Sequence, residues 1–191
     1  MPTLEYAVLD SPIDPLLAVA GPEGLLALEF DAARRLKTVR ARLARHLGDV
    51  ELRPAPLRGG PLAPVREWFA RYWDGSALEG ATLPHVLLGT AFQVAVWRAL
   101  LEVPAGTTRT YGQLAHRVGR PEAARAVGAA VGQNPVAIVV PCHRIIGANG
   151  SLTGFGGGLP RKKWLLAHEA DHAQAPDSRR ARGRQLALWG A

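Results

Sequence analysis

The run "NPVAIVVPCHRIIGANG", residues 134–150, places the only cysteine of the chain, Cys142, between a proline and a histidine. A lone cysteine is most often a small hydrophobic residue packed in a core. A nucleophilic one needs a base or a cation nearby, because a free thiol has a pKa of about 8.5 and is mostly protonated at pH 7. His143 is adjacent, but successive side chains of an extended segment point to opposite faces. The pair therefore requires a turn at Pro141, or a bridging water molecule.

An imidazole that accepts a proton also needs a carboxylate to orient it. The second half of the chain offers few candidates, namely Glu102, Glu122, Glu169, Asp171 and Asp177. Spacing alone does not choose among them, and it leaves both a catalytic and a structural role open for Cys142.

A second pattern, "HEADH" at residues 168–172, matches the H-E-x-x-H motif of zinc proteases. That chemistry requires both imidazoles on one helix face, a third ligand and an open coordination position. The match lies where an apparent helix gives way to a polar tail, and no third-ligand motif follows. We therefore expect His172 to lie outside the helix, and we predict no metal site.

The 23 Lys and Arg and 16 Asp and Glu of the 191-residue chain are unevenly placed. Residues 1–89 hold 10 basic and 11 acidic side chains, whereas residues 90–191 hold 13 and 5. This asymmetry indicates that the C-terminal half faces a polyanion, the alternative being a solvated basic surface. One cysteine excludes an intramolecular disulfide and suits a reducing compartment. Without a visible signal peptide or an apolar segment of membrane length, we expect a cytoplasmic protein.

The N-terminal half has short apolar runs separated by Asp-Ser-Pro and Gly-Pro-Glu-Gly, which predict a small antiparallel meander. Leu36, Val39, Leu43 and Leu47 then recur at helical spacing, in a helix that ends at Gly48. A second helix is predicted around residues 65–72. The segment 74–89 resembles a linker, so we place a domain boundary near residue 85.

In the C-terminal half, Thr90 with Gln93 and Thr110 with Gln113 have the spacing of capping boxes, which mark two helix starts. The second of these helices stops at Gly119, and another runs from residue 121 to about 132. With the small Ala115 at the crossing, this layout predicts a helix–turn–helix, although an ordinary helical hairpin is the alternative. The later helix has Arg125 as its one long side chain among Ala and Gly. It would read few base edges, so we expect little sequence preference.

The segment 134–169, "NPVAIVVPCHRIIGANGSLTGFGGGLPRKKWLLAHE", closely resembles the active-site block of O6-alkylguanine-DNA alkyltransferases. The hallmark of that family is Pro-Cys-His-Arg followed by an apolar residue. The likeness extends through "FQVAVWRALLEVPAGTTRTYGQLA" and "AARAVGAAVGQNP", so it covers about residues 85–170. It implies an α/β protein with a small ribonuclease H-like support domain over residues 1–85, an antiparallel sheet plus a helix. A mainly helical, winged helix–turn–helix-like domain over 86–172 would follow, and then a basic, disordered tail over 173–191.

The resemblance further implies a single-turnover methylated-DNA–[protein]-cysteine S-methyltransferase. Such a protein moves an alkyl group from O6-alkylguanine, or from O4-alkylthymine, onto its own cysteine. Cys142 would be the acceptor, His143 would act on it through a water molecule, and Glu169 would orient the imidazole. Asn134 would brace the turn before the thiol, and Tyr111 would lie against the flipped guanine and donate a proton or a hydrogen bond to it.

The same resemblance implies the binding surfaces. Arg125 would fill the gap that the flipped base leaves in the duplex, and the other DNA contacts would be Thr110, Tyr111, Gly112 and Arg120. The alkylguanine pocket would comprise Val131, Pro141, Ile145, Phe155 and Gly156. No cofactor and no obligate protein partner are implied. The alternatives are a regulator with an inert cysteine and a lesion-binding protein without transfer, and the presence of Cys142 argues against the latter.

Overall fold

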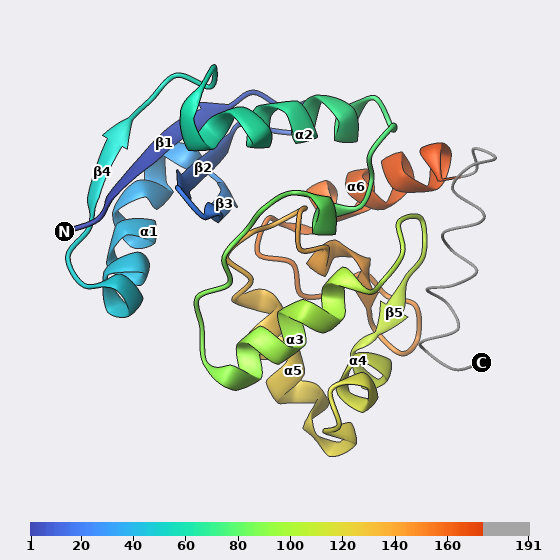
Figure 1. The fold of residues 1–191 in the computed structure, drawn as a ribbon. Helices are drawn as coiled ribbons and strands as arrows, with labels where there is room; N and C mark the ends of the chain where they lie inside the picture. The colour runs from blue at the N-terminus through green and yellow to red at the C-terminus, as the bar shows by residue number, and fades with distance from the viewer. Residues whose placement is uncertain (174–191) are drawn as a thin grey trace.

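The computed structural model describes residues 1–173 of the chain, and its N-terminal half is built on a four-stranded sheet (Figure 1). Strands β1 (Thr3–Leu9), β2 (Leu16–Gly21) and β3 (Gly24–Phe30) form the predicted antiparallel meander. Strand β4 (Glu51–Pro54) adds parallel to β1, giving the order β3-β2-β1-β4. The sequence did not reveal β4, because it is short and ends in a proline, which only an edge strand tolerates.

Helices cover both faces of this sheet. Helix α1 (Ala32–Leu47) buries Val39 and Leu43 against one face and ends, as predicted, at Gly48, whose φ is 73°. The other face packs on α2 (Ala63–Trp73) and on the C-terminal half, within one continuous hydrophobic core. A 3₁₀ turn, η1 (Gly60–Leu62), leads into α2.

The outer edge of β3 is paired with two segments from later in the chain. Leu25 N donates to Pro84 O and Val86 N donates to Leu25 O, at 2.9 and 2.8 Å. Leu28 N likewise donates to Pro135 O, at 2.9 Å. Residues 135–137 thus join the N-terminal sheet just before the thiol, and the apolar run 136–140 forms isolated bridges rather than a regular strand.

Segment 74–89 is not the loose linker that its composition predicts. It contains the 3₁₀ turn η2 (Gly80–Thr82), and it buries Leu78 and Leu83 in the core. The fit at Gly80 is tight, since a Cβ built there would lie 1.8 Å from the carbonyl oxygen of Val139. This segment therefore holds the chain just upstream of Cys142.

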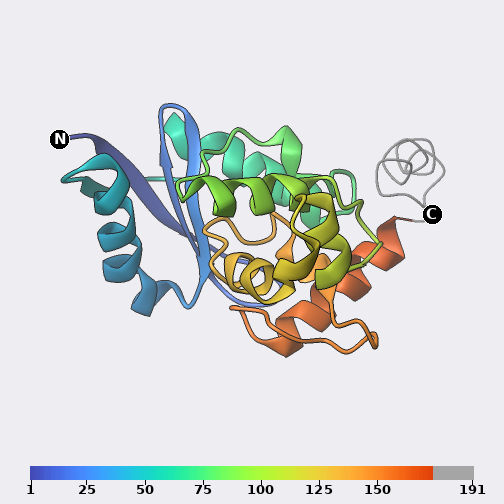
Figure 2. The same ribbon diagram turned by 90° about the horizontal axis from the view of Figure 1, so that it is seen from below.

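The C-terminal half is mainly helical, with α3 (Ala91–Leu101), α4 (Tyr111–Arg117), α5 (Ala124–Gly132) and α6 (Leu159–His172). Short strands β5 (Arg109–Thr110) and β6 (Ile145–Ile146) pair in parallel, and 3₁₀ turns η3 (Pro121–Ala123) and η4 (Cys142–Arg144) complete the list. Both capping boxes are present, and Ala115 is fully buried where α4 packs on α5. Viewed from below, α3, α4 and α5 lie together beside the sheet (Figure 2). The predicted α/β class is confirmed.

The predicted C-terminal tail and the expected lack of a membrane segment complete the comparison with the sequence. Beyond Ala173, the predicted tail lies outside the described residues. Within residues 1–173, no helix is both long enough and apolar enough to cross a bilayer.

Candidate functional site

The chain turns at Pro141, as a joint role of the neighbouring Cys142 and His143 side chains would require. Pro141 has φ −82° and ψ 62°, and Cys142 N donates to Val140 O at 2.8 Å. These values describe an inverse γ-turn. Cys142 and His143 then lie in the 3₁₀ turn η4 rather than in a strand, so the alternation of an extended segment does not separate them.

Asn134 fixes both the backbone of this turn and the thiol. Its Nδ2 donates to Val140 O at 2.8 Å and to Sγ of Cys142 at 3.1 Å. Its Oδ1 accepts from Val136 N at 3.0 Å. Burial raises the pKa of the Cys142 thiol, while the Asn134 hydrogen bond and the nearby charge of Lys162 act in the opposite direction. The thiol is therefore protonated at rest, in a site that holds a donor for its thiolate.

His143 is fully buried and pairs with Glu169, whose Oε1 lies 2.9 Å from Nε2 of the imidazole. Because a carboxylate only accepts, Nε2 carries the hydrogen and Nδ1 keeps its lone pair. Burial lowers the pKa of His143, although the negative charge of Glu169 opposes the shift. Nδ1 has no hydrogen-bond partner among the described residues. The imidazole is thus neutral, oriented by its carboxylate, and able to accept a proton at Nδ1.

Arg144 holds Glu169 in place, a role that sequence reasoning missed. Its Nε and Nη2 donate to the two carboxylate oxygens of Glu169, each at 2.8 Å. The other N–H groups donate to Leu78 O at 2.9 Å, to Oε2 of Glu79 at 3.1 Å and to Val103 O. All five guanidinium donors are therefore used. An arginine followed by Ile-Ile in an apolar run was the available signal, because a buried charge requires a partner.

Tyr72 is a second residue that the sequence did not point to. It is fully buried in α2, and its hydroxyl donates to Oε1 of Glu169 at 2.9 Å. Burial raises the pKa of Tyr72 well above its usual range, with the charge of Glu169 adding to the shift. Burial alone would raise the pKa of Glu169, but the cation Arg144 and the donor His143 hold it well below its usual range. Glu169 is therefore an anion with Tyr72, His143 and Arg144 as donors.

Tyr111 lies at the start of α4, with its hydroxyl directed at the loop that follows β6. The hydroxyl hydrogen is shared between Thr153 O and Gly154 O, both 3.2 Å away. The same Thr153 O accepts from Nζ of the buried Lys162 at 2.6 Å. One hydrogen-bonded cluster thus joins Tyr111, residues 153–154 and Lys162. The positive charge of Lys162 also acts on Cys142, where it favours the thiolate.

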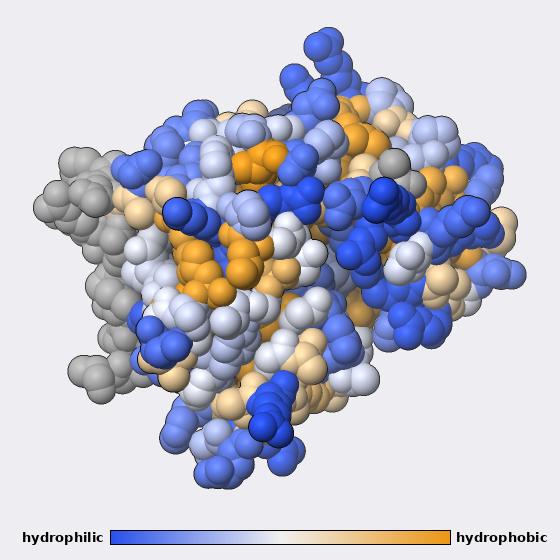
Figure 3. All heavy atoms as spheres, turned by 180° about the vertical axis from the view of Figure 1, so that it is seen from behind, coloured by the Kyte–Doolittle hydropathy of each residue, from blue (hydrophilic) through white to orange (hydrophobic). Residues whose placement is uncertain are grey.

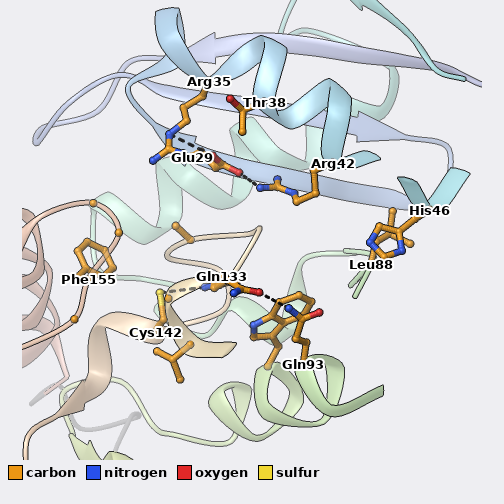
Figure 4. Close-up of a pocket in the computed structure, with 18 of the residues that line it drawn as sticks. Glu29, Arg35, Thr38, Arg42, His46, Leu88, Gln93, Gln133, Cys142 and Phe155 are labelled. Atoms are coloured by element: carbon orange, nitrogen blue, oxygen red, sulfur yellow. Dashed lines mark hydrogen bonds and ion pairs between the residues drawn. The ribbon is translucent and has the colours of Figure 1, made fainter. Parts of the chain in front are cut away.

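A cavity of about 480 Å³ gives access to the thiol (Figure 4). Cys142 lines it together with three of the predicted pocket residues, Val131, Phe155 and Gly156. The other two, Pro141 and Ile145, are buried and do not line it. Helix α1 forms the opposite wall, so the N-terminal half contributes to this cavity.

The predicted DNA contacts gather on α4, α5 and the turn between them. Gly112, Arg120 and Arg125 are exposed, while Thr110 is partly buried and caps α4. Besides Arg125, the exposed residues of α5 are Ala126, Ala129 and Gly132, so this face is smooth apart from one long side chain.

Both histidines of the "HEADH" segment lie in α6, so the expectation that His172 lies outside the helix is wrong. His168 stacks on Trp164 and its Nε2 donates to Tyr72 O at 2.9 Å, while Nδ1 of His172 donates to His168 O at 2.8 Å. Within residues 1–173, no group of three His, Cys, Asp or Glu side chains could hold a metal ion. The segment instead packs α6 on α2 and supplies Glu169 to the thiol site.

Known proteins are similar to this chain in sequence and in fold. A family model described as the DNA-binding domain of 6-O-methylguanine DNA methyltransferase matches residues 91–171. The chain is 45% identical over 161 residues to a methylated-DNA–protein-cysteine methyltransferase of Salmonella typhimurium, covering 83% of this chain and 91% of that protein. This chain belongs to the methylated-DNA–protein-cysteine methyltransferase family. The resemblance seen in the sequence is thereby confirmed.

Further relatives of the methyltransferase family agree. A match to the Shigella flexneri methylated-DNA–protein-cysteine methyltransferase is 54% identical over 111 residues, which is 58% of this chain and 63% of that protein, less than two thirds of its length. The structure of Mycobacterium tuberculosis O6-methylguanine methyltransferase aligns with a TM-score of 0.75 and 39% identity, covering 92% of this chain and 98% of that one. The Mycobacterium tuberculosis OGT structure in complex with DNA aligns at 0.74 and 38%, covering 97% and 99%.

Proposed function

We propose that this methyltransferase-family protein repairs DNA by taking an alkyl group from O6-alkylguanine, and from O4-alkylthymine, onto Sγ of Cys142. The observation that carries the proposal is the placement of one thiol, with an amide donor, at the wall of a cavity beside a neutral imidazole. Alkyl transfer from oxygen needs a soft nucleophile, and a thiolate is the softest that side chains provide. The Salmonella typhimurium relative is named for methyl transfer from DNA to a protein cysteine, and its match covers 83% of this chain and 91% of that protein.

In the proposed step, the thiol proton passes through a water molecule to Nδ1 of His143, and Sγ attacks the alkyl carbon. The bond between that carbon and O6 breaks, and its electron pair stays on the guanine, which then gains a proton. The Tyr111 hydroxyl and amides of the 153–156 loop stabilise the leaving base. A thioether has no easy way back to a thiol, so one protein molecule repairs one base.

A base inside a duplex is out of reach of a buried thiol, so the nucleotide must flip out of the helix, at a cost of a few kcal/mol. Arg125 on α5 would occupy the gap, and Thr110, Gly112 and Arg120 would hold the flanking backbone. The small residues of α5 allow close approach to a groove without base readout, which fits repair at any sequence. The related Mycobacterium tuberculosis OGT has a structure in complex with DNA, which supports DNA as the partner.

The finer organisation follows the family. We propose a ribonuclease H-like support domain over residues 1–85 and a winged helix–turn–helix-like domain over 86–172, in which α4 and α5 are the paired helices. Pro141 and Ile145 would shape the pocket from within the core, and Phe155 and Gly156 would close it. A nucleophilic thiol has to stay reduced, which fits a cytoplasmic protein. The proposed transfer uses the Cys142 thiol of one chain, and we propose neither a cofactor nor an obligate protein partner.

The deciding experiment is a mass measurement after incubation with excess O6-methylguanine duplex. We expect one added methyl group per chain, located on the peptide that contains Cys142, and restored guanine without a strand break. Cys142→Ser should still bind the duplex and transfer nothing, because a hydroxyl is a far weaker nucleophile at neutral pH. Binding without any methyl gain in the unaltered protein would instead identify a lesion-binding protein.

A further inference from the structure

Helix α1 is strongly basic, although the net charge of the N-terminal half is close to zero. Its sixteen residues include six Lys or Arg, one histidine and no carboxylate. Residues 1–89 as a whole hold 10 basic and 11 acidic side chains. The near-neutral half is therefore divided into one strongly basic helix and an acidic remainder. Seen from behind, hydrophilic residues gather over α1 (Figure 3).

One face of α1 looks into the cavity that contains the thiol (Figure 4). The cavity-lining residues of the helix are spaced by three or four positions, or adjoin one another, and we call them the α1 stripe: Arg35, Thr38, Arg42, Arg45 and His46. Such spacing places side chains on one side of a helix. Every member is a hydrogen-bond donor, and three are guanidinium groups, whereas Val39 and Leu43 face the sheet.

Among the described residues, the α1 stripe has ion pairs with a single carboxylate. Glu29 of β3 pairs with Arg42 and, at 3.6 Å, with Arg35. Nη2 of Arg42 is buried without a hydrogen-bond partner among the described residues. Arg45 is exposed, and its side chain makes no ion pair or hydrogen bond within residues 1–173. The stripe thus keeps unused donors and uncompensated positive charge beside the route to Cys142.

We propose that the α1 stripe binds backbone phosphates of the DNA strand that carries the flipped nucleotide, as a second DNA contact apart from α4 and α5. The inference rests on the proposed function. A nucleotide delivered to Cys142 stays joined to phosphates on both sides, and its backbone must pass the mouth of this cavity. Guanidinium groups match phosphate oxygens in geometry and charge, and phosphate contacts position a strand without reading its sequence.

The test compares two exposed arginines of α1, one that lines the cavity and one that does not. Arg45→Gln removes a charge from the stripe, and Arg34→Gln removes the same charge from an exposed position of α1 that does not line the cavity. In a Cys142→Ser background, affinity for O6-methylguanine duplex is measured at several salt concentrations. We expect Arg45→Gln to weaken binding roughly tenfold and to reduce the salt slope by about 0.9, the value of one phosphate contact. Arg34→Gln should change both far less.

With Cys142 present, the single-turnover rate at low, subsaturating duplex should fall in Arg45→Gln in proportion to its affinity, since the stripe is proposed to act in binding, whereas Arg34→Gln should keep the rate of the unaltered protein. Equal effects of Arg45→Gln and Arg34→Gln on affinity and slope would overturn the proposal, as would a loss of rate in Arg45→Gln without a loss in affinity. Failure of the unaltered protein to gain a methyl group would refute the proposed function alone, because the binding comparison still decides the role of the stripe.

Discussion

The hydroxyl of Tyr72 donates a 2.9 Å hydrogen bond to Oε1 of Glu169, a residue 97 positions later in the chain. The same oxygen accepts from Nε2 of His143 and from Nη2 of Arg144. Through this bond α2, which belongs to the N-terminal half, reaches the carboxylate that orients the imidazole beside Cys142. The N-terminal half therefore supplies part of the proposed catalytic arrangement as well as the sheet on which it rests.

Tyr72→Phe tests this contact. Loss of a buried hydrogen bond to a carboxylate should lower the free energy of unfolding by about 2 kcal/mol. Transfer from methylated duplex should slow by roughly threefold to tenfold, because Arg144 still holds Glu169 while one anchor is gone. Denaturant unfolding and single-turnover kinetics measure the two effects. Tyr6→Phe is the matched control, and a loss of stability with an unchanged rate would assign the Tyr72 hydroxyl to the fold alone.

Glu169→Gln should affect stability more than Tyr72→Phe does. The substitution leaves the buried Arg144 without its bidentate partner, which typically costs about 3–5 kcal/mol. Transfer should also slow, since a neutral amide no longer favours the proton on His143, while the end point stays at one methyl per chain. Glu102→Gln, in the partly exposed pair with Arg117, should change the unfolding free energy by less than about 1 kcal/mol. Similar losses of unfolding free energy in both variants would contradict the role of Glu169 as the buried partner of Arg144.

The transfer rate should rise with pH into the alkaline range. Burial raises the pKa of Cys142, so the thiolate fraction keeps growing above the pKa of an ordinary thiol. Burial lowers the pKa of His143, so protonation of the imidazole should add no separate step to the pH profile near the usual histidine pKa. Single-turnover rates between about pH 5.5 and 10 check both the alkaline rise and the acidic side of the profile. A plateau already reached at neutral pH would mean that the resting site holds a thiolate.

Gly80→Ala should disturb the chain upstream of the thiol. A Cβ at this position would lie 1.8 Å from Val139 O, so the backbone must shift, at a cost of roughly 1–3 kcal/mol. Gly132→Ala is the control, because a Cβ there meets nothing within 4 Å and alanine favours a helix. Thermal unfolding of the two variants gives the comparison. If the two glycines tolerate alanine equally, segment 74–89 is less closely packed than the contacts of Gly80 indicate.

The "HEADH" segment should be insensitive to metal removal. The rings of His168 and His172 each donate to a backbone carbonyl, and Glu169 is committed to Arg144 and His143. Transfer should survive a strong chelator, and His172→Ala should leave the rate unchanged while lowering the melting temperature slightly. Stoichiometric zinc in the purified protein, with loss of activity on its removal, would be the contrary result.

The sequence predicted those parts of the fold that local rules determine. The meander, the two capping boxes and the Gly48 helix end depend on residues a few positions apart, so short-range spacing was sufficient. The partners of Arg144 and Glu169 were beyond such reasoning, because Tyr72 and Glu79 come from helix α2 and the segment after it. Charge totals also misled, since the balance over residues 1–89 averaged α1 with its acidic surroundings. The roles of Cys142, His143 and Asn134 came from the family likeness rather than from spacing.

The pairing of Leu28 with Pro135 and Ala137 has a consequence for biosynthesis. Strand β3 emerges from the ribosome long before the residues that cover its outer edge, and an uncovered edge strand readily pairs with other chains. Until synthesis passes residue 137, the part of this edge at Leu28 is open to association with neighbouring nascent chains. The step that closes it is also the one that brings the thiol segment into place, so protection from aggregation and acquisition of the nucleophile occur together.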